Sequence, residues 1–405
     1  MHYYECQNIL NKVFSDTAKE SVHPELQLRI TRRDFISIGE NILPGAEHYA
    51  CKEHKILFSE STPIPPREEN SVIEINDYHI RENKFFPYTI VTPHDSTLCK
   101  GVIFLFHGLN EKKWTKYLPW VHALIKATGK AVILFPLAFH MERAPNLWSD
   151  TRKMRQVSDL RSLTTDNSAS SFVNAAISVR LELDPQRIFW SGFQTYIDMR
   201  QMISSLRQGE FPYIHKDATI DFFGYSIGAF FSLILLAANP KSYLDRSRFF
   251  AFCGGATLDR MYPISKYIMD MRSSIAIQKF YEEQLNTGFQ SDERLRHYLS
   301  EEHPEQNFFK SILKYRYFRE LREERMLSLS DRIYAVALIK DDVVPPHEVM
   351  NTLQGSYRNI PIPVDILDFD YPYSHIRPFS PEIKYAPLVD EAFSTVMGKA
   401  AAFLQ

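Results

Sequence analysis

The pentapeptide Gly224-Tyr225-Ser226-Ile227-Gly228 constrains the fold of this chain more than any other feature. It has the form Gly-x-Ser-x-Gly, and it lies between the apolar stretches ATIDFF and AFFSLILLAA. A serine on a sharp turn between a strand and a helix has a strained backbone that exposes its hydroxyl. Strand and helix then nearly touch, so the residues two before and two after the serine must be small. The pattern predicts that Ser226 is a nucleophile, rather than a structural serine in a tight turn.

A serine nucleophile needs a base, usually a histidine that a carboxylate orients. With this type of turn, the order along the chain is serine, acid, histidine. Four histidines follow Ser226. His297 and His303 lie in a charged helical stretch, where we expect solvated surfaces, and His347 is expected to begin a helix. His375, in the loop YPYSHIRPF after the last predicted strand, is the predicted base; the alternative is a loop histidine packed on neighbouring tyrosines.

The triad acid is expected in the loop KDDVVPP, which follows the strand-like stretch RIYAVALI. Asp341 and Asp342 are adjacent there, and only one of the two side chains can face His375. The spacing Asp-x-Val-Val-Pro favours Asp341, and Asp342 remains the alternative. A plain turn or helix-capping role is the structural alternative for either residue.

Attack on a carbonyl builds negative charge on its oxygen, which two backbone N–H groups can stabilise. We expect one donor at Ile227, directly after the nucleophile, and the other in the loop HGLNE after the strand GVIFLF. Leu109 is the first choice for the second donor, and Asn110 is the next. His107 is interpreted as a residue that supports this loop.

A further loop, PLAFHMERAPNLWSD, leaves the carboxyl edge of the sheet, where ligands bind in open α/β sheets. His140, Arg143 and Trp148 are candidates for lining a substrate pocket, together with Asn110 and Tyr225 near the nucleophile. For the loop residues, the alternative is a purely structural role with the tryptophan buried.

The chain alternates short apolar strands with amphipathic helices, which is typical of a parallel sheet covered on both faces. Residues 1–70 are interpreted as an irregular N-terminal extension with a helix near Cys6 to Glu20 and a break at STPIPPREEN, Ser61 to Asn70. The stretches SVIEINDYHI and FFPYTIVTP predict an antiparallel hairpin. RIFWSGF is interpreted as strand-like, and residues 257–330 as a helical block without strands.

Composition excludes several classes of function. The net charge of −2 gives no overall electrostatic footprint for nucleic acid. The N-terminus lacks the pattern of a signal peptide, and no apolar run is long enough to cross a bilayer. The four cysteines form no CxxC pair and do not indicate a disulfide framework, which favours a reducing compartment. We therefore expect a soluble, cytoplasmic protein and leave its oligomeric state open.

Together, HGLNE, GYSIG, DDVVP and the SH before Ile376 make the chain resemble the α/β-hydrolase superfamily, over Phe85 to Leu404 outside an insertion. The resemblance implies an α/β fold with a mostly parallel, eight-stranded α/β-hydrolase sheet, a covalent acyl-enzyme, no cofactor and no metal. It implies core segments at 71–256 and 331–405, with residues 257–330 as a helical lid. The extension at 1–70 and the extra segment before GYSIG depart from the family pattern.

The function predicted from these features is that of a serine hydrolase, of carboxylesterase, lipase or peptidase type. Its substrate would be a small-molecule ester or, less favoured, an amide or peptide bond, cleaved through an acyl-enzyme on Ser226. Two alternatives remain at this point: a binding protein of the same fold without catalysis, and an acyltransferase that uses the same triad. The sequence does not distinguish water from another acyl acceptor.

Overall fold

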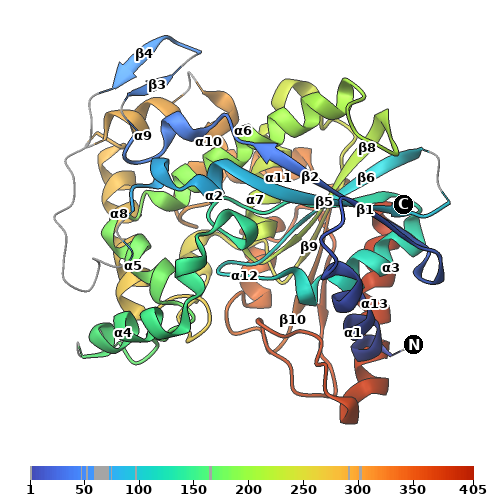
Figure 1. Ribbon diagram of the computed structural model, residues 1–405. Coiled ribbons are helices and arrows are strands. Elements are labelled where there is room, and N and C mark those ends of the chain that lie inside the picture. The colour runs from blue at the N-terminus through green and yellow to red at the C-terminus, as the bar shows by residue number, and fades with distance from the viewer. Residues whose placement is uncertain are drawn as a thin grey trace.

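The computed structural model describes residues 2–46, 48–51, 53–58, 73, 75–95, 98–163, 167–290, 292–300 and 303–405 (Figure 1). The predicted break at Ser61 to Asn70 lies outside these residues, as do Ser71, Val72 and Glu74 of the first strand predicted for the opening hairpin. Among the helices of the described residues, none is long and apolar enough to cross a membrane.

A nine-stranded sheet in the order β1-β2-β5-β7-β6-β8-β9-β10-β11 forms the centre of the fold. Its strands are β1 (Glu20–His23), β2 (Leu28–Ile36), β5 (Phe85–Pro93), β6 (Cys99–Phe106), β7 (Ala131–Leu134), β8 (Ile214–Tyr225), β9 (Phe249–Phe252), β10 (Ile333–Leu338) and β11 (Val364–Leu367). The six strands from β7 to β11 in this order are parallel, whereas β1, β2 and β5 pair antiparallel. A separate hairpin is formed by β3 (Tyr49–Cys51) and β4 (Ile56–Phe58).

The helices pack in layers on the two faces of this sheet (Figure 1). Their bounds are α1 Tyr3–Phe14, α2 Arg81–Lys84, α3 Leu118–Thr128, α4 Thr151–Ser162, α5 Ala175–Leu183, α6 Arg187–Arg207, α7 Ile227–Ala238, α8 Met271–Thr287, α9 Glu293–Tyr298, α10 Pro304–Ser311, α11 Arg319–Ser328, α12 Pro346–Leu353 and α13 Ala386–Leu404. Residues of α1, α3 and α13 share one apolar core, residues of α6 and α7 belong to a second, and residues of α4 and α5 belong to a smaller third.

The central strands show why the sheet is covered on both faces. Every residue from Gly101 to Phe106 in β6 is buried. Phe104 and Phe106 belong to the core on the α6 and α7 side, while Ile103 and Leu105 belong to the opposite core. Successive side chains of a strand point to opposite faces, so a continuous apolar run buries both. The predicted fold class, a mostly parallel α/β-hydrolase sheet flanked by helices, is confirmed.

The edge formed by the N-terminal residues differs from the sequence prediction. The interpretation of this region as irregular was wrong, because β1 and β2 extend the sheet. The predicted partner of FFPYTIVTP was also wrong, because β5 pairs with β2 and β7. Two arginines, Arg32 and Arg33, interrupt the apolar alternation of β2, and both lie beyond the residues of β2 that pair with β1. The sheet therefore has nine strands instead of the eight expected.

The stretch RIFWSGF is helical, which corrects its interpretation as a strand. It forms the start of α6, a single helix from Arg187 to Arg207. A short apolar run does not distinguish a strand from a buried helix, and here the apolar positions continue at helical spacing through Phe193, Tyr196 and Met199. Within residues 257–330, the described part is helical apart from turns and one isolated bridge between Ile264 and Met269.

Candidate active site

Ser226 sits on a sharp turn between β8 and α7. Its φ of 56° and ψ of −119° are in a region that residues with a side chain rarely adopt. A Cβ on Gly224 would lie 2.6 Å from the Cα of Ala229, and one on Gly228 would lie 2.7 Å from the carbonyl oxygen of His107. Both contacts are too close for real atoms, so the two glycines are what allow strand and helix to approach around the serine.

The structure brings Ser226, His375 and Asp341 together. The Oγ of Ser226 is 2.8 Å from Nε2 of His375, and Nδ1 of His375 is 2.8 Å from Oδ2 of Asp341. All three residues are buried, with exposed fractions of 6%, 2% and 3%. Asp342 is exposed. The geometry therefore separates the two candidate acids, because only Asp341 contacts the imidazole.

Backbone donors hold Asp341 in place. Its Oδ1 accepts hydrogen bonds from the N–H groups of Val343 at 3.0 Å and Val344 at 2.8 Å. Because the carboxylate of Asp341 faces Nδ1 of His375, the proton of the neutral imidazole lies on Nδ1. The Nε2 lone pair then faces the Ser226 hydroxyl, which donates to it. This is the orientation a general base requires.

Tyr225 supports the histidine instead of lining the substrate pocket, which corrects the prediction for this residue. It is 1% exposed, and its hydroxyl donates to the carbonyl oxygen of His375. The two rings stack with centroids 5.5 Å apart. As the last residue of β8, Tyr225 belongs to the core on the α3 and α13 side.

The loop after β6 lies beside the serine. Leu109 and Ile227 both line the cavity at Ser226. Within the described part of the chain, neither of their backbone N–H groups donates a hydrogen bond to another protein group. Asn110, at a φ of 61°, fixes the loop through its side-chain amide, which donates to the carbonyl oxygens of Val173 and Tyr267. Two backbone N–H groups without a protein partner thus belong to residues that line the same cavity as Ser226.

His107 has the supporting role that the sequence indicated. It is fully buried, and its Nε2 accepts a hydrogen bond from the backbone N–H of Leu137 at 3.0 Å. Its Nδ1 must then carry the proton that it donates to the carbonyl oxygen of Gly108, 2.8 Å away. Burial lowers the pKa of His107 well below its ordinary value. The ring is a neutral bridge between two loops at the carboxyl edge of the sheet.

A large cavity opens at the serine. Its empty volume is about 1820 Å³, which includes its opening to solvent. Three segments supply most of its apolar wall: α5 with α6, the start of α7, and the insertion at 257–330. Representative lining residues are Ile177, Phe189, Phe193, Phe230, Ile277 and Phe309. The segment between β7 and β8 thus contributes more of the lining residues than the insertion does.

Three residues at one corner of this cavity each have a buried nitrogen atom without a hydrogen-bond partner within the described residues. These atoms are Nε2 of His140, Nε1 of Trp148 and one terminal nitrogen of Arg180. Nδ1 of His140 donates to the carbonyl oxygen of Ala138, so its Nε2 carries a lone pair. Burial lowers the pKa of His140 to about 4, which keeps the ring neutral. The three atoms are one acceptor and two donors.

Arg180 was not predicted as a site residue. Its guanidinium pairs with Asp77 at 2.9 Å and stacks 4.2 Å from the ring of Trp148. Burial lowers its pKa to about 10, so it remains charged at neutral pH. The available signal was one arginine among the apolar residues of the helix AAISVRLEL, and the sequence prediction did not use it.

Arg143 lies elsewhere, which corrects its assignment to the substrate pocket. It is fully buried and forms an ion pair with Asp198 of α6 at 2.8 Å. Its Nε also donates to the side-chain oxygen of Asn83. The other two predicted loop residues, His140 and Trp148, do line the cavity. A buried charge needs a fixed partner, and Asp198 provides it.

Comparisons with known proteins give one family and a group of distant structures. The model of a family of unknown function (DUF6051) matches residues 1–405. None of the curated proteins compared with the chain is similar to it in sequence. Solved structures that resemble the fold include an esterase from Pyrobaculum calidifontis, with a TM-score of 0.43 and 10% identity, covering 99% of this chain and 89% of that one.

Two further structures have similar scores. Carboxyl esterase 2 from the mycorrhizal fungus Tuber melanosporum has a TM-score of 0.41 and 11% identity, covering 80% of this chain and 83% of that one. A thermostable esterase from Pseudomonas putida has a TM-score of 0.41 and 10% identity, covering 100% and 98%. At such low scores, the fold assignment rests on the sheet order of this chain.

Proposed function

The chain belongs to a family of unknown function, DUF6051, and we propose that it is a serine hydrolase that cleaves small-molecule esters. The observation that carries the proposal is the 2.8 Å contact between the Ser226 hydroxyl and His375, whose other nitrogen faces Asp341. A strained serine with a base and an orienting acid is the arrangement that acyl transfer requires.

The reaction follows from the positions of these groups. Ser226 Oγ bonds to the carbonyl carbon of the ester while its proton passes to Nε2 of His375. The resulting oxyanion accepts hydrogen bonds from the N–H groups of Ile227 and Leu109. The bond to the alcohol oxygen then breaks, and His375 returns the proton to that oxygen. Water repeats the sequence on the acyl-enzyme and releases the carboxylic acid and the free serine.

The cavity suggests the class of substrate. Its wall is mostly aromatic and aliphatic, which suits an ester with an apolar acyl or alcohol part. The corner at His140, Trp148 and Arg180 leaves buried hydrogen-bonding groups without partners. Such groups discriminate strongly in favour of a ligand that pairs with them. We therefore assign a preference for substrates whose apolar part also carries a hydrogen-bonding group.

The insertion at 257–330 is proposed to act as the lid of this cavity. Leu258, Met269, Ile277 and Phe309 contribute side chains to the wall opposite the sheet. A buried pair between Arg161 of α4 and Asp270, at 2.7 Å, attaches the start of α8 to the adjacent segment. In this proposal, the attachment joins α4 to the insertion, whose residues form part of the cavity wall.

Hydrolysis of p-nitrophenyl esters of increasing chain length tests the proposal. We expect the wild-type chain to release p-nitrophenol, and Ser226→Ala or His375→Ala to lower kcat/KM by about 10⁴-fold or more. Ser232→Ala is the matched control, since Ser232 is a buried serine of α7 whose hydroxyl donates only to the carbonyl oxygen of Gly228. Equal activity in wild type and Ser226→Ala would contradict the proposal.

A further inference from the structure

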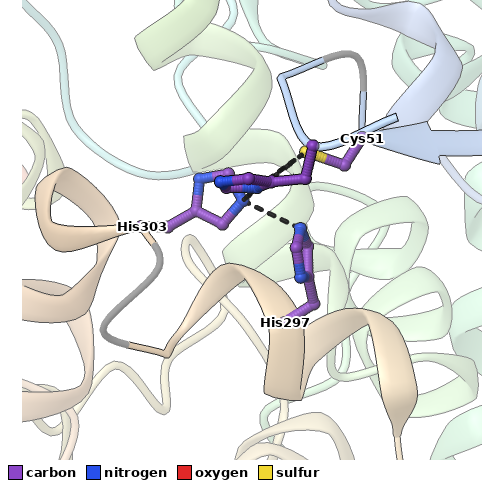
Figure 2. Close-up of side chains that lie close together, drawn as sticks. Cys51, His297 and His303 are labelled. Carbon is purple, nitrogen blue, oxygen red and sulfur yellow. Dashed lines mark hydrogen bonds between the residues drawn. The ribbon is translucent and has the colours of Figure 1, made fainter. Parts of the chain in front are cut away.

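Four side chains of metal-binding type converge away from the serine. Cys51 ends β3, His54 lies in the turn that follows, His297 belongs to α9, and His303 precedes α10. The thiol and one ring nitrogen from each histidine all lie within 4.8 Å of one another. Figure 2 shows Cys51, His297 and His303 directed toward a common point from the hairpin and from the insertion.

Four of the six distances among these atoms are known, and they are close to the edges of a small tetrahedron. Sγ of Cys51 is 3.6 Å from Nδ1 of His54 and 3.5 Å from Nε2 of His303. Nε2 of His303 is 3.2 Å from Nδ1 of His54 and 2.9 Å from Nε2 of His297. Around a tetrahedral zinc ion, ordinary bond lengths place a sulfur and a nitrogen about 3.6 Å apart, and two nitrogens about 3.4 Å apart.

Proton counting argues against a plain hydrogen-bonded cluster. Nε2 of His303 carries either one hydrogen or one lone pair, yet it faces Sγ of Cys51, Nδ1 of His54 and Nε2 of His297 at once. One hydrogen does not satisfy three such neighbours, and lone pairs that face one another repel. A cation at the centre would accept a lone pair from each.

We propose that Cys51, His54, His297 and His303 bind one zinc ion in a closed, four-ligand structural site. One thiolate and three imidazoles suit zinc, whose structural sites are tetrahedral with nitrogen and sulfur ligands. Cys51 is 3% exposed and His303 is 4% exposed, so two of the four ligands are shielded from solvent. The site departs from our sequence-based expectation of no metal and of solvated positions for His297 and His303.

Neighbouring contacts hold the ligands in position. Nδ1 of His303, on the far side of the ring from the cluster, faces the carboxylate of Glu53 at 3.9 Å. A carboxylate near the second nitrogen of a ligating histidine is a common feature of zinc sites. The hydroxyl of Tyr298 donates to the carbonyl oxygen of Ala50, and the guanidinium of Arg294 lies 3.6 Å from the ring centre of Tyr49. Two elements that carry ligands, β3 and α9, are therefore already in contact.

The proposed ion would join the β3–β4 hairpin to the insertion at 257–330. His303 directly precedes α10, and that helix carries Phe309 into the cavity wall next to Phe189 and Phe230. The ion would thus restrain part of the cavity roof from a distance, without contact to the reacting atoms. Structural metal sites contribute folding energy directly, because the ligands converge only in the folded chain.

The metal content of the full-length protein tests this proposal. We expect an untagged protein, expressed in zinc-supplemented medium, to contain about one zinc per chain by inductively coupled plasma mass spectrometry. Cys51→Ser and His303→Ala should lose the ion. Cys99→Ser, a buried cysteine outside the cluster, and His79→Ala, an exposed histidine, are the matched controls and should retain it.

Two additional measurements apply even if Cys51→Ser or His303→Ala fails to fold. His54→Ala removes a ligand from a surface turn and should lower zinc content. Cobalt substitution of the wild-type chain should give the spectrum of a tetrahedral site with a thiolate-to-metal band. Zinc content far below one per chain in the wild type, or a cobalt spectrum without thiolate or tetrahedral character, would overturn the proposal.

Discussion

The Ser226 site and the Cys51–His303 cluster are both groups of buried polar side chains, but their protons are distributed differently. In the first, each short contact has one donor and one acceptor, from Ser226 to His375 and from His375 to Asp341. In the second, Nε2 of His303 faces three other polar atoms with at most one hydrogen. The first network is complete within the protein, whereas the proposed zinc ion would complete the second. The Ser226 site is therefore suited to proton transfer, whereas the Cys51–His303 cluster is suited to binding a metal ion through its lone pairs.

The largest effect is expected from the choice of acid beside His375. We predict that Asp341→Asn lowers kcat/KM for a p-nitrophenyl ester by about 10⁴-fold, because the amide no longer stabilises the imidazolium and favours the wrong tautomer. Asp342→Asn, at the exposed neighbouring position, should change it by less than about 2-fold. Steady-state kinetics on both variants measures the two changes in kcat/KM. Equal losses in the two variants would remove the distinction between the two aspartates.

Metal removal should affect the two regions differently. We expect a chelator to lower the Tm of the wild-type chain by about 5 °C or more, because the zinc-binding free energy is part of the folding free energy. Ser226→Ala should keep or raise the Tm, since alanine removes a polar group from a strained position without touching the metal ligands. Differential scanning fluorimetry with and without chelator measures both. A Tm insensitive to chelator in a zinc-loaded sample would mean that the ion does not support the fold.

Acid pH should weaken the fold through the buried neutral histidines. Burial lowers the folded-state pKa of His140 to about 4 and that of His107 well below 6.5. The unfolded chain then binds more protons between about pH 6.5 and pH 4, so stability is lost as the pH falls through this window. For His140 alone, the expected loss is about 3 kcal/mol, at about 1.4 kcal/mol per pH unit.

Urea unfolding at several pH values measures this loss. A His140→Phe variant should show a smaller decrease in the free energy of unfolding between pH 6.5 and pH 4. If the free energy of unfolding of that variant had the same pH dependence as that of the wild type, the pKa of His140 would not be lowered in the folded chain.

The smallest effect is expected in the polar corner of the cavity. Trp148→Phe removes one donor while keeping the aromatic surface, and we expect it to raise KM by about 5-fold for an ester with a hydrogen-bonding group on its apolar part. KM for a purely hydrocarbon ester of similar length should stay within about 2-fold. A parallel kinetic series on both substrates measures the difference. Equal changes for both would assign Trp148 to packing alone.

The sequence predicted the fold best where a short local pattern determines the element that forms. The apolar runs of β6 and β8, and the Gly-x-Ser-x-Gly turn between β8 and α7, mark their own positions because buried parallel strands are continuously apolar. The loops that hold Asp341 and His375 could be predicted because they come directly after the last two strands along the chain. At β2, Arg32 and Arg33 obscured the alternation, and only the pairing with β5 reveals the strand.

The Cys51–His303 cluster was beyond the reach of local patterns. Cys51 and His54 are separated from His297 and His303 by more than half the chain, and neither pair is distinctive alone. Only the packing of the β3–β4 hairpin against α9 brings the two pairs together. In the same way, Arg143 sits in a loop that does line the cavity, yet Asp198 on a later helix draws its side chain into a buried ion pair. Both cases depend on distant contacts, which a linear pattern does not encode.

Covalent labelling of Ser226 tests the central claim most directly. A fluorophosphonate reacts with a serine that is activated by a base, and peptide mass spectrometry locates the adduct. We predict a single stoichiometric adduct on the peptide that contains Ser226, lost in Ser226→Ala, strongly slowed in His375→Ala and retained in Ser232→Ala. An unlabelled wild-type chain, or a label that persists in Ser226→Ala, would contradict the account.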